Sequence, residues 1–360
     1  MSEAPQPSKE GEAAGLLPGA SSHVLSWAVV VGIGALVLLF ASSDLGELWR
    51  TATAIHPVLL LIPFLFSLGS YVTMSLSYAG IARAAGARVR FWEMYKVTIV
   101  GNTVNYIVTT GGLSGFAVRM YFFIRMGIPS GTAVIISLVQ TFITNVILLC
   151  FVVLGFGYLL MNHEVTGLAF GTTAAFMGIS VVATLVAIML LLHRELRRRT
   201  LFVMAEASNS FMHRFLPTRK PARVSIWRFQ RNLNRGIEFL LQRKRRMILP
   251  TLWIVADWMA TILILYSAFW IIGSPIPMSI VIVGFSIGIV LSIVSFVPGG
   301  LGIMEGSMSA IFVSLSVPLE TAVIAVLIFR VAYYFLPMVI SLFFFRGMLV
   351  QGTRAAPAAL

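Results

Sequence analysis

The sequence is poor in charged residues, cysteine and histidine. Charged residues make up 11% of its 360 residues, whereas a soluble domain carries about 25%, so a soluble enzyme is excluded. The single cysteine, Cys150, excludes an intramolecular disulfide and a cysteine-based metal site. The five histidines are scattered, and the sequence contains no glycine-rich phosphate-binding loop. We therefore expect no metal ion, no other cofactor and no ATP-driven step within this chain.

Apolar residues are abundant instead. They make up 58% of the chain, and the mean hydropathy is +0.93. A membrane-spanning helix needs about 20 consecutive apolar residues. The clear apolar runs are residues 24–41, 56–82, 133–160, 167–192, 248–272 and 321–345. These runs predict an all-α polytopic membrane protein with about six full spans.

The net charge of +13 is concentrated in one segment. Residues 194–246 hold 15 of the 26 basic residues and three acidic ones, which gives this segment a net charge of +12. Because cytoplasmic loops of inner-membrane proteins are enriched in lysine and arginine, we place this segment in the cytoplasm. The same reasoning predicts an inner-membrane protein with both termini in the cytoplasm, and it argues against nucleic-acid binding.

Part of this basic segment has the pattern of an amphipathic helix. Apolar residues recur every three or four positions from Ile226 to Leu240, and charged residues fall between them. Such a helix would lie on the cytoplasmic leaflet and attract anionic lipids. Alternatively, its charge only fixes the topology. The basic residues of this expected lipid surface are Arg228, Arg231, Arg235, Arg243, Lys244, Arg245 and Arg246.

Two further apolar segments, residues 91–125 and 278–316, are interrupted by glycine. With the loop 42–55 outside and Arg83–Arg90 inside, both ends of the first segment are cytoplasmic. When the same alternation of cytoplasmic and outside ends is followed from the C-terminal side, both ends of the second segment lie outside. We therefore expect two re-entrant helical hairpins that dip from opposite faces. Their tips are expected at Gly111 and Gly112, and at Pro298, Gly299 and Gly300.

The two hairpins are similar in sequence. The motif GGL recurs after 188 residues, and a proline and the motif TAVI recur after 189. Similar halves of opposite orientation predict an inverted-topology repeat, as in transporters whose substrates bind near the midplane. The expected organisation is a disordered tail (1–22), a first membrane half (23–193), a basic cytoplasmic linker (194–246), a second membrane half (247–346) and a C-terminal tail (347–360).

Charged residues within the apolar segments are the strongest candidates for a functional site. They are Arg119, Asp257, Glu305 and Arg330. A charge at the centre of a bilayer costs at least about 2.5–3.5 kcal/mol, so partners are expected, and Glu305 with Arg330 is the natural pair. Functionally, Arg119 and Arg330 would hold an anionic head group, while Glu305 would exchange between Arg330 and a proton or an amine. The alternative is a structural ion pair that fixes the second hairpin to the last span.

Polar residues of the first hairpin complete the expected substrate site. A half-helix that begins after a glycine tip directs the positive end of its dipole at the midplane, where it suits a phosphate group. Ser114 would cap this half-helix, and Asn102 and Asn105 would line its cavity. Close packing through small residues is the alternative. Asp257 and Glu305 are candidates for proton coupling, although Asp257 could equally bond a nearby threonine or asparagine in protonated form.

Two motifs of the second half resemble those of a flippase-like integral membrane family. They are VPGGLGIMEG at residues 297–306 and FRVAYYFLP at residues 329–337. This family is the transmembrane region of bacterial lysylphosphatidylglycerol synthases, the multiple peptide resistance factors. The similar first-half pattern comprises Asn102, Asn105, Gly111, Gly112 and Arg119. The resemblance covers residues 24–346 and implies lipid movement. Because the chain ends at Leu360 without an aminoacyl-transfer domain, we expect it not to be an enzyme.

The expected function is that of a lipid flippase or scramblase. It would move a phospholipid or a lipid-linked head group between leaflets through a polar cavity at the midplane. The expected partners are membrane lipids, namely anionic or aminoacylated phospholipids or lipid-linked sugars. Two alternatives stay open: a membrane subunit that presents a lipid to a separate transferase, and a secondary transporter of a small molecule or ion. A transferase and a second copy of the chain are further candidate partners.

Overall fold

A computed structural model describes residues 22–107, 113–162, 244–295 and 297–354, together with single positions between residues 178 and 242. Over this part of the chain every regular element is a helix, which confirms the expected all-α polytopic fold. Most of the expected basic linker, with its amphipathic helix, lies outside the described residues, as does the Gly111-Gly112 tip of the first hairpin.

Four helical segments of the described part are long and apolar enough to cross a membrane. They are Pro57–Ala84, which contains α3 (Leu61–Ala84); Ser130–Gly155, within α6 (Ser130–Asn162); Arg245–Ile271, which contains α10 (Ile248–Ile271); and Leu319–Phe345, which contains α13 (Leu319–Arg330) and the first half of α14 (Leu336–Arg354). Between α13 and α14 the backbone forms a π-helical turn, Val331–Phe335. The expected span at 167–192 lies almost wholly outside the described residues.

The N-terminal region differs from the expectation. α1 (Ser22–Ala41) is followed by a second helix, α2 (Leu45–Ala54), where we expected a loop, and the two are bent by 88°. The carboxylate of Asp44 caps α2 by accepting hydrogen bonds from the N–H groups of Gly46 (2.8 Å) and Glu47 (3.2 Å). If this bent pair counts as one span, the described part of the chain has five.

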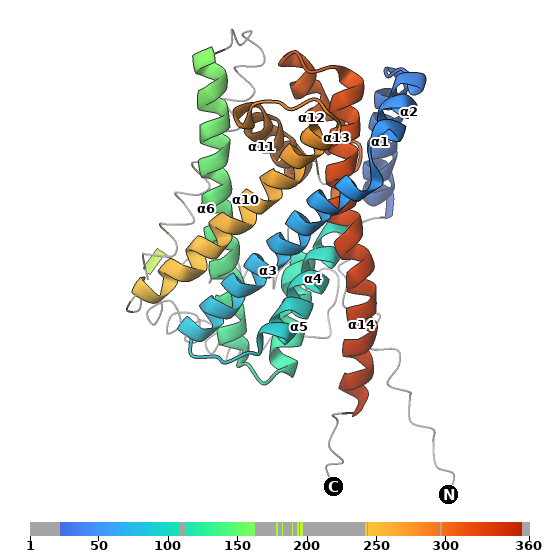
Figure 1. Ribbon diagram of the computed structural model, residues 1–360. Helices are drawn as coiled ribbons and strands as arrows, with labels where there is room; N and C mark the ends of the chain where they lie inside the picture. Colours follow the sequence, from blue (N-terminus) through green and yellow to red (C-terminus); the bar gives the residue numbers. More distant parts are fainter. Residues whose placement is uncertain are drawn as a thin grey trace, which may run out of the picture.

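Two pairs of short helices form hairpins. The first consists of α4 (Phe91–Ile107) and α5 (Leu113–Arg125), and the second of α11 (Met278–Val294) and α12 (Ile303–Ser314). The two arms of each hairpin pack against each other, and the hairpins lie toward opposite ends of the molecule (Figure 1). Arms of 17 residues reach about 25 Å, less than the thickness of the hydrocarbon core. The geometry suits re-entrant hairpins, and their depth in a membrane stays a prediction.

α3 and α10 lie side by side and pack extensively at the centre of the molecule (Figure 1). Each hairpin rests on a span of the other half, because α4 packs against α14 and α11 packs against α6. Two halves related by inverted symmetry must make equivalent contacts of this kind. This reciprocal packing of each hairpin on the other half therefore supports the inverted repeat, which itself stays a prediction.

The tip of the second hairpin requires glycine. Gly299, Gly300 and Gly302 have positive φ angles of 59°, 62° and 76°, a conformation that residues with side chains rarely adopt. A Cβ atom on Gly302 would lie 1.9 Å from the backbone oxygen of Gly32 in α1. The tip therefore turns tightly and packs directly against the backbone of α1.

We expect Gly302→Ala to destabilise the fold by roughly 2–5 kcal/mol, because it adds both a strained backbone conformation and a steric clash. The measurement is the midpoint of thermal unfolding of the full chain in detergent. Gly306→Ala is the matched control, since nothing lies within 4 Å of a Cβ atom at that position. Equal midpoints for the two variants would contradict the tight packing of the tip.

Both ends of the first hairpin are expected to face the cytoplasm. After replacement of the exposed Cys150, single cysteines are introduced as Arg90→Cys and Arg125→Cys, both at exposed positions. A membrane-impermeant maleimide should label neither position in intact cells and both in inverted membrane vesicles, whereas Ser42→Cys should label in intact cells. Labelling of positions 90 and 125 from opposite sides would show that the segment crosses the membrane.

Candidate functional site

An arginine–glutamate pair lies where the second hairpin meets the last span. Glu305 is in the first turn of α12, and Arg330 is the last residue of α13. The Arg330 Nε atom donates a hydrogen bond to Glu305 Oε1, and both side chains are buried. Arg330 Nη1 also donates to the backbone oxygen of Gly299, 2.6 Å away. One guanidinium group therefore ties the last span to both the tip and the arm of the second hairpin.

The hydrogen-bonding groups of this pair do not all have partners among the described residues. Glu305 Oε2 and Arg330 Nη2 are buried and have no hydrogen-bond partner among the described residues. A buried polar group without a partner costs about 1–3 kcal/mol, and more when it is charged. The pair therefore offers one acceptor and one donor to a polar ligand, and guanidinium groups are well suited to phosphate or carboxylate.

A cluster of tyrosine side chains lies beside Arg330 and connects it to the first hairpin. The guanidinium group lies 4.3 Å from the ring centre of Tyr334, which is a cation–π contact. Tyr333 and Tyr334 belong to the π turn, a feature that is frequent at functional sites. The ring of Tyr106, in the last turn of α4, lies 4.6 Å from that of Tyr334, and its hydroxyl group donates to that of Tyr333 at 3.3 Å. The end of α4 thus reaches the surroundings of Arg330.

This tyrosine cluster was not predicted from the sequence. α3 contributes Tyr71, whose ring lies 6.2 Å from that of Tyr333. The available signal was the motif FRVAYYFLP, in which Tyr333 and Tyr334 follow Arg330 by about one helical turn. A pair of tyrosines next to an intramembrane arginine is a natural source of cation–π contacts.

A second buried arginine lies in the first hairpin. Arg119 of α5 is 5% exposed, and its Nη1 atom donates to Asn102 Oδ1 of α4 at 3.0 Å. Its guanidinium group lies 5.5 Å from the ring centre of Tyr78. Gly101 permits this approach, because a Cβ atom there would lie 2.8 Å from Arg119 Cγ. Arg119 Nε has no hydrogen-bond partner in the described part of the chain.

Asn105 and Ser114 are further polar residues of the first hairpin. Asn105 Oδ1 is buried and finds no hydrogen-bond partner within the described ranges. The hydroxyl group of Ser114 donates to the backbone oxygen of Val104 at 3.5 Å, which links the two arms. The structure therefore gathers Arg119, Asn102, Asn105 and Ser114 on one hairpin, while Glu305 and Arg330 form a second group.

Asp257 lies in the interface between α3 and α10. It is 3% exposed, and the hydroxyl group of Ser70 donates a hydrogen bond to its Oδ1 atom. The hydroxyl oxygen of Thr261 lies 3.3 Å from that of Ser70, so three polar groups form a small cluster. Asp257 makes no ion pair with any described residue. A carboxyl group in this setting suits either proton coupling or a structural hydrogen bond.

The remaining predicted positions are exposed or lie outside the description. Arg245 and Arg246 are exposed beside the start of α10. Among the described residues there is no group of three or more His, Cys, Asp or Glu side chains that could hold a metal ion. Outside the described residues lie Gly111, Gly112, Arg228, Arg231, Arg235, Arg243 and the side chain of Lys244.

The Arg330–Glu305 pair is expected to behave as one unit. Glu305→Gln or Arg330→Gln alone leaves an uncompensated buried charge and should cost about 3–5 kcal/mol, whereas the double variant should cost less than the sum. The measurement is thermal unfolding in detergent. The matched control is Glu93–Lys96, a more exposed pair at 3.0 Å, whose neutralisation should change stability by less than about 1 kcal/mol. Additive effects at the buried pair would contradict the coupling.

Part of the sequence is shared with enzymes of known name. Over 86 residues the chain is 37% identical to a phosphatidylglycerol lysyltransferase of Staphylococcus haemolyticus (strain JCSC1435). Over 86 residues it is also 34% identical to a phosphatidylglycerol lysyltransferase of Staphylococcus aureus (strain COL). Each match covers 24% of this chain and 10% of the relative, so the shared segment is a small part of these enzymes.

The match to a protein family extends much further along the chain. The family described as "Lysylphosphatidylglycerol synthase TM region" matches residues 25–341. This range contains both hairpins and the Arg330–Glu305 pair, so the resemblance seen in the sequence motifs is confirmed. The chain therefore belongs to the lysylphosphatidylglycerol synthase transmembrane-region family.

Proposed function

We propose that this chain moves a phospholipid, or the head group of another membrane lipid, between the two leaflets. The observation that carries the proposal is the buried Arg330–Glu305 pair beside the tip of the second hairpin, whose Nη2 and Oε2 atoms have no partner among the described residues. A buried ion pair contributes little to stability unless its partners are complete. Its open donor and acceptor are therefore best explained by a charged ligand.

The head group would bind beside the tip of the second hairpin. A phosphate oxygen matches Arg330 Nη2, because guanidinium groups bind phosphate through adjacent N–H donors. As the phosphate arrives, Glu305 would release Arg330, and its carboxylate would accept a proton or bind an amine of the head group. In this exchange neither charge is left alone in the membrane interior, so the large cost of an unpaired ion is avoided.

Arg119 would provide a second binding position along the path. Its Nε atom and Asn105 Oδ1 are buried groups without partners in the described part of the chain. α4 contacts both groups, because its Asn102 binds Arg119 and its Tyr106 reaches the tyrosines beside Arg330. The hydrocarbon tails would stay in the bilayer, and the protein would shelter only the head group.

We place the protein in the inner membrane with both termini in the cytoplasm. The last turn of α3 and the connection after it carry three exposed arginine residues, Arg83, Arg88 and Arg90. The positive-inside rule assigns this end of α3 to the cytoplasm. The opposite end of α3, beside α2, would then face the outside.

A second candidate function is that of a membrane subunit that presents a lipid to a separately encoded transferase. This candidate is favoured by the names of the two staphylococcal relatives, both of which are lysyltransferases. In that case the same site would hold the lipid without moving it, and the chain itself would not catalyse the transfer.

Lipid translocation is measured in proteoliposomes with labelled anionic, zwitterionic and cationic lipids. We expect the wild type to move at least one of these classes. Arg330→Lys keeps the charge but removes the planar guanidinium fork, and Glu305→Gln removes the exchanging carboxylate. Both should slow translocation at least tenfold, equivalent to about 1.4 kcal/mol in the barrier. Glu93→Gln, in the more exposed pair, is the matched control and should leave the rate unchanged.

Each variant is first checked for an intact fold by gel filtration and by its unfolding midpoint. Wild-type rates in well-folded Arg330→Lys and Glu305→Gln proteins would overturn the assignment of the site. Failure of the wild type to move any of the lipid classes would overturn the transport proposal and would favour the lipid-presenting subunit.

A further inference from the structure

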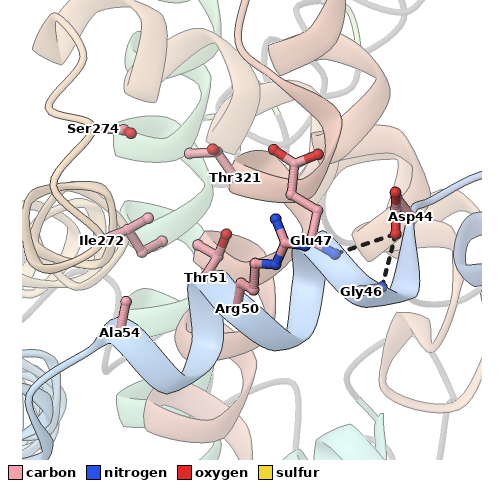
Figure 2. Close-up of a pocket in the computed structure, with 9 residues that line it drawn as sticks. All are labelled: Asp44, Gly46, Glu47, Arg50, Thr51, Ala54, Ile272, Ser274 and Thr321. Atoms are coloured by element: carbon pink, nitrogen blue, oxygen red, sulfur yellow. Dashed lines mark hydrogen bonds between the residues drawn. The ribbon is translucent and has the colours of Figure 1, made fainter.

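A hollow of about 580 Å³ lies between α2 and the neighbouring ends of α10 and α13. In Figure 2, Glu47, Arg50 and Thr51 of α2 line one side, and Ser274 and Thr321 line the other. Its volume is within the range of small-ligand sites, roughly 300–1,000 Å³. None of these residues belongs to the Arg119 group or the Arg330–Glu305 pair, so the hollow is separate from the site described above.

α2 has the character of a helix that lies in the membrane surface. It is bent by 88° from α1. Its buried residue, Leu48, packs on Val323 and Ile324 of α13, while Leu45 and Trp49 are 65% and 72% exposed. Interfacial helices place such apolar side chains among the lipids, and tryptophan is enriched at this depth. The hollow on the polar side of α2 would therefore open beside lipid head groups.

The hollow is lined by one charge of each sign that has no partner among the described residues. The side chains of Glu47 and Arg50 make no ion pair or hydrogen bond with any described residue. The other nearby carboxylates already have roles, because Asp44 caps α2 and Glu320 accepts a hydrogen bond from the Asp44 N–H group at 3.2 Å. One guanidinium and one carboxylate thus remain for a ligand that carries both an anionic and a cationic group.

A threonine of α13 adds a hydroxyl group to the lining of the hollow. Thr321 lines the hollow (Figure 2) and is 9% exposed. Its hydroxyl group makes no hydrogen bond with any residue that the structure describes, although threonine in a helix commonly bonds to the preceding turn. Its oxygen is not one of the fully buried atoms without a partner in the described part of the chain, so it is accessible from the hollow and can donate to a phosphate oxygen bound there.

We propose that this hollow binds a zwitterionic phosphate–ammonium head group at the outer membrane surface. Arg50 and the hydroxyl groups of Thr51 and Thr321 would hold the phosphate, and Glu47 would hold the ammonium group. The acyl chains would lie beside Leu45 and Trp49. The choice of a lipid as the source rests on the proposed function, whereas the pairing of a phosphate with an ammonium group rests on the hollow alone.

Binding is measured by calorimetry on the full chain in detergent, with dihexanoyl phosphatidylethanolamine as the probe. Glu47→Gln and Arg50→Gln should each weaken binding about tenfold, and Thr321→Val about threefold or more. The matched controls are Arg88→Gln and Thr53→Val. Arg88 is exposed in the connection after α3, and the hydroxyl group of Thr53 donates to the backbone of α2. Both controls should bind the probe like the wild type.

Two further probes separate the two charges and the source of the ligand. Dihexanoyl phosphatidic acid has the phosphate without the amine, so Arg50→Gln should weaken its binding and Glu47→Gln should not. Free phosphoethanolamine that binds as tightly as the lipid would support the zwitterion site and assign it to a soluble ligand. Unchanged phosphatidylethanolamine binding in all three hollow variants would overturn the proposal. Because no transport is measured, these outcomes are independent of the translocation assay.

Discussion

The contact between Arg330 and Glu305 is the interaction on which the organisation of the interior depends. A re-entrant tip leaves backbone groups without helical partners, and such groups must be satisfied inside the protein. Arg330 supplies a donor to the Gly299 carbonyl group and, through Nε, to the Glu305 carboxylate. One side chain thus satisfies both the unpaired backbone of the tip and a buried acid. Because either ion alone would be costly, the tip stays against the last span unless another charged group takes the place of one partner.

Much of this arrangement could be predicted from the sequence, because it follows from the cost of charge in a membrane. That cost alone pairs Glu305 with Arg330, which the structure brings into direct contact. The long apolar runs likewise predict the spans that the described part contains. The α2 helix was not predicted, because the acidic and basic residues between 42 and 55 were interpreted as a loop. An Asp cap followed by Leu45, Leu48 and Trp49 at helical spacing was the available signal.

Contacts between distant parts of the chain are what the sequence could not reveal. The hydroxyl groups of Tyr106 and Tyr333 meet across 227 positions, and Ser70 meets Asp257 across 187. Such pairs depend on how one half of the molecule packs on the other, which neither composition nor periodicity specifies.

The two proposed binding sites differ in their electrostatic environment. Arg330 and Glu305 are buried and paired, and charges interact strongly in a low dielectric. Glu47 and Arg50 are exposed, so water and salt screen their interactions.

The packing of α4 on α14 has a consequence for the order in which the protein is made. Ribosomal synthesis produces the first hairpin early, together with α3, which packs on α4, yet another neighbour of α4 is the last helix of the described chain, α14. Arg119 finds Asn102 within its own hairpin, so this charge has a partner while the rest of the protein is still being translated. The second hairpin has no comparable delay, because α6 precedes it and Arg330 follows Glu305 by only 25 residues. Insertion of α14 is therefore the event that completes the packing around the first hairpin, and a nascent chain that stops short of it leaves the α14-facing side of α4 without this neighbour.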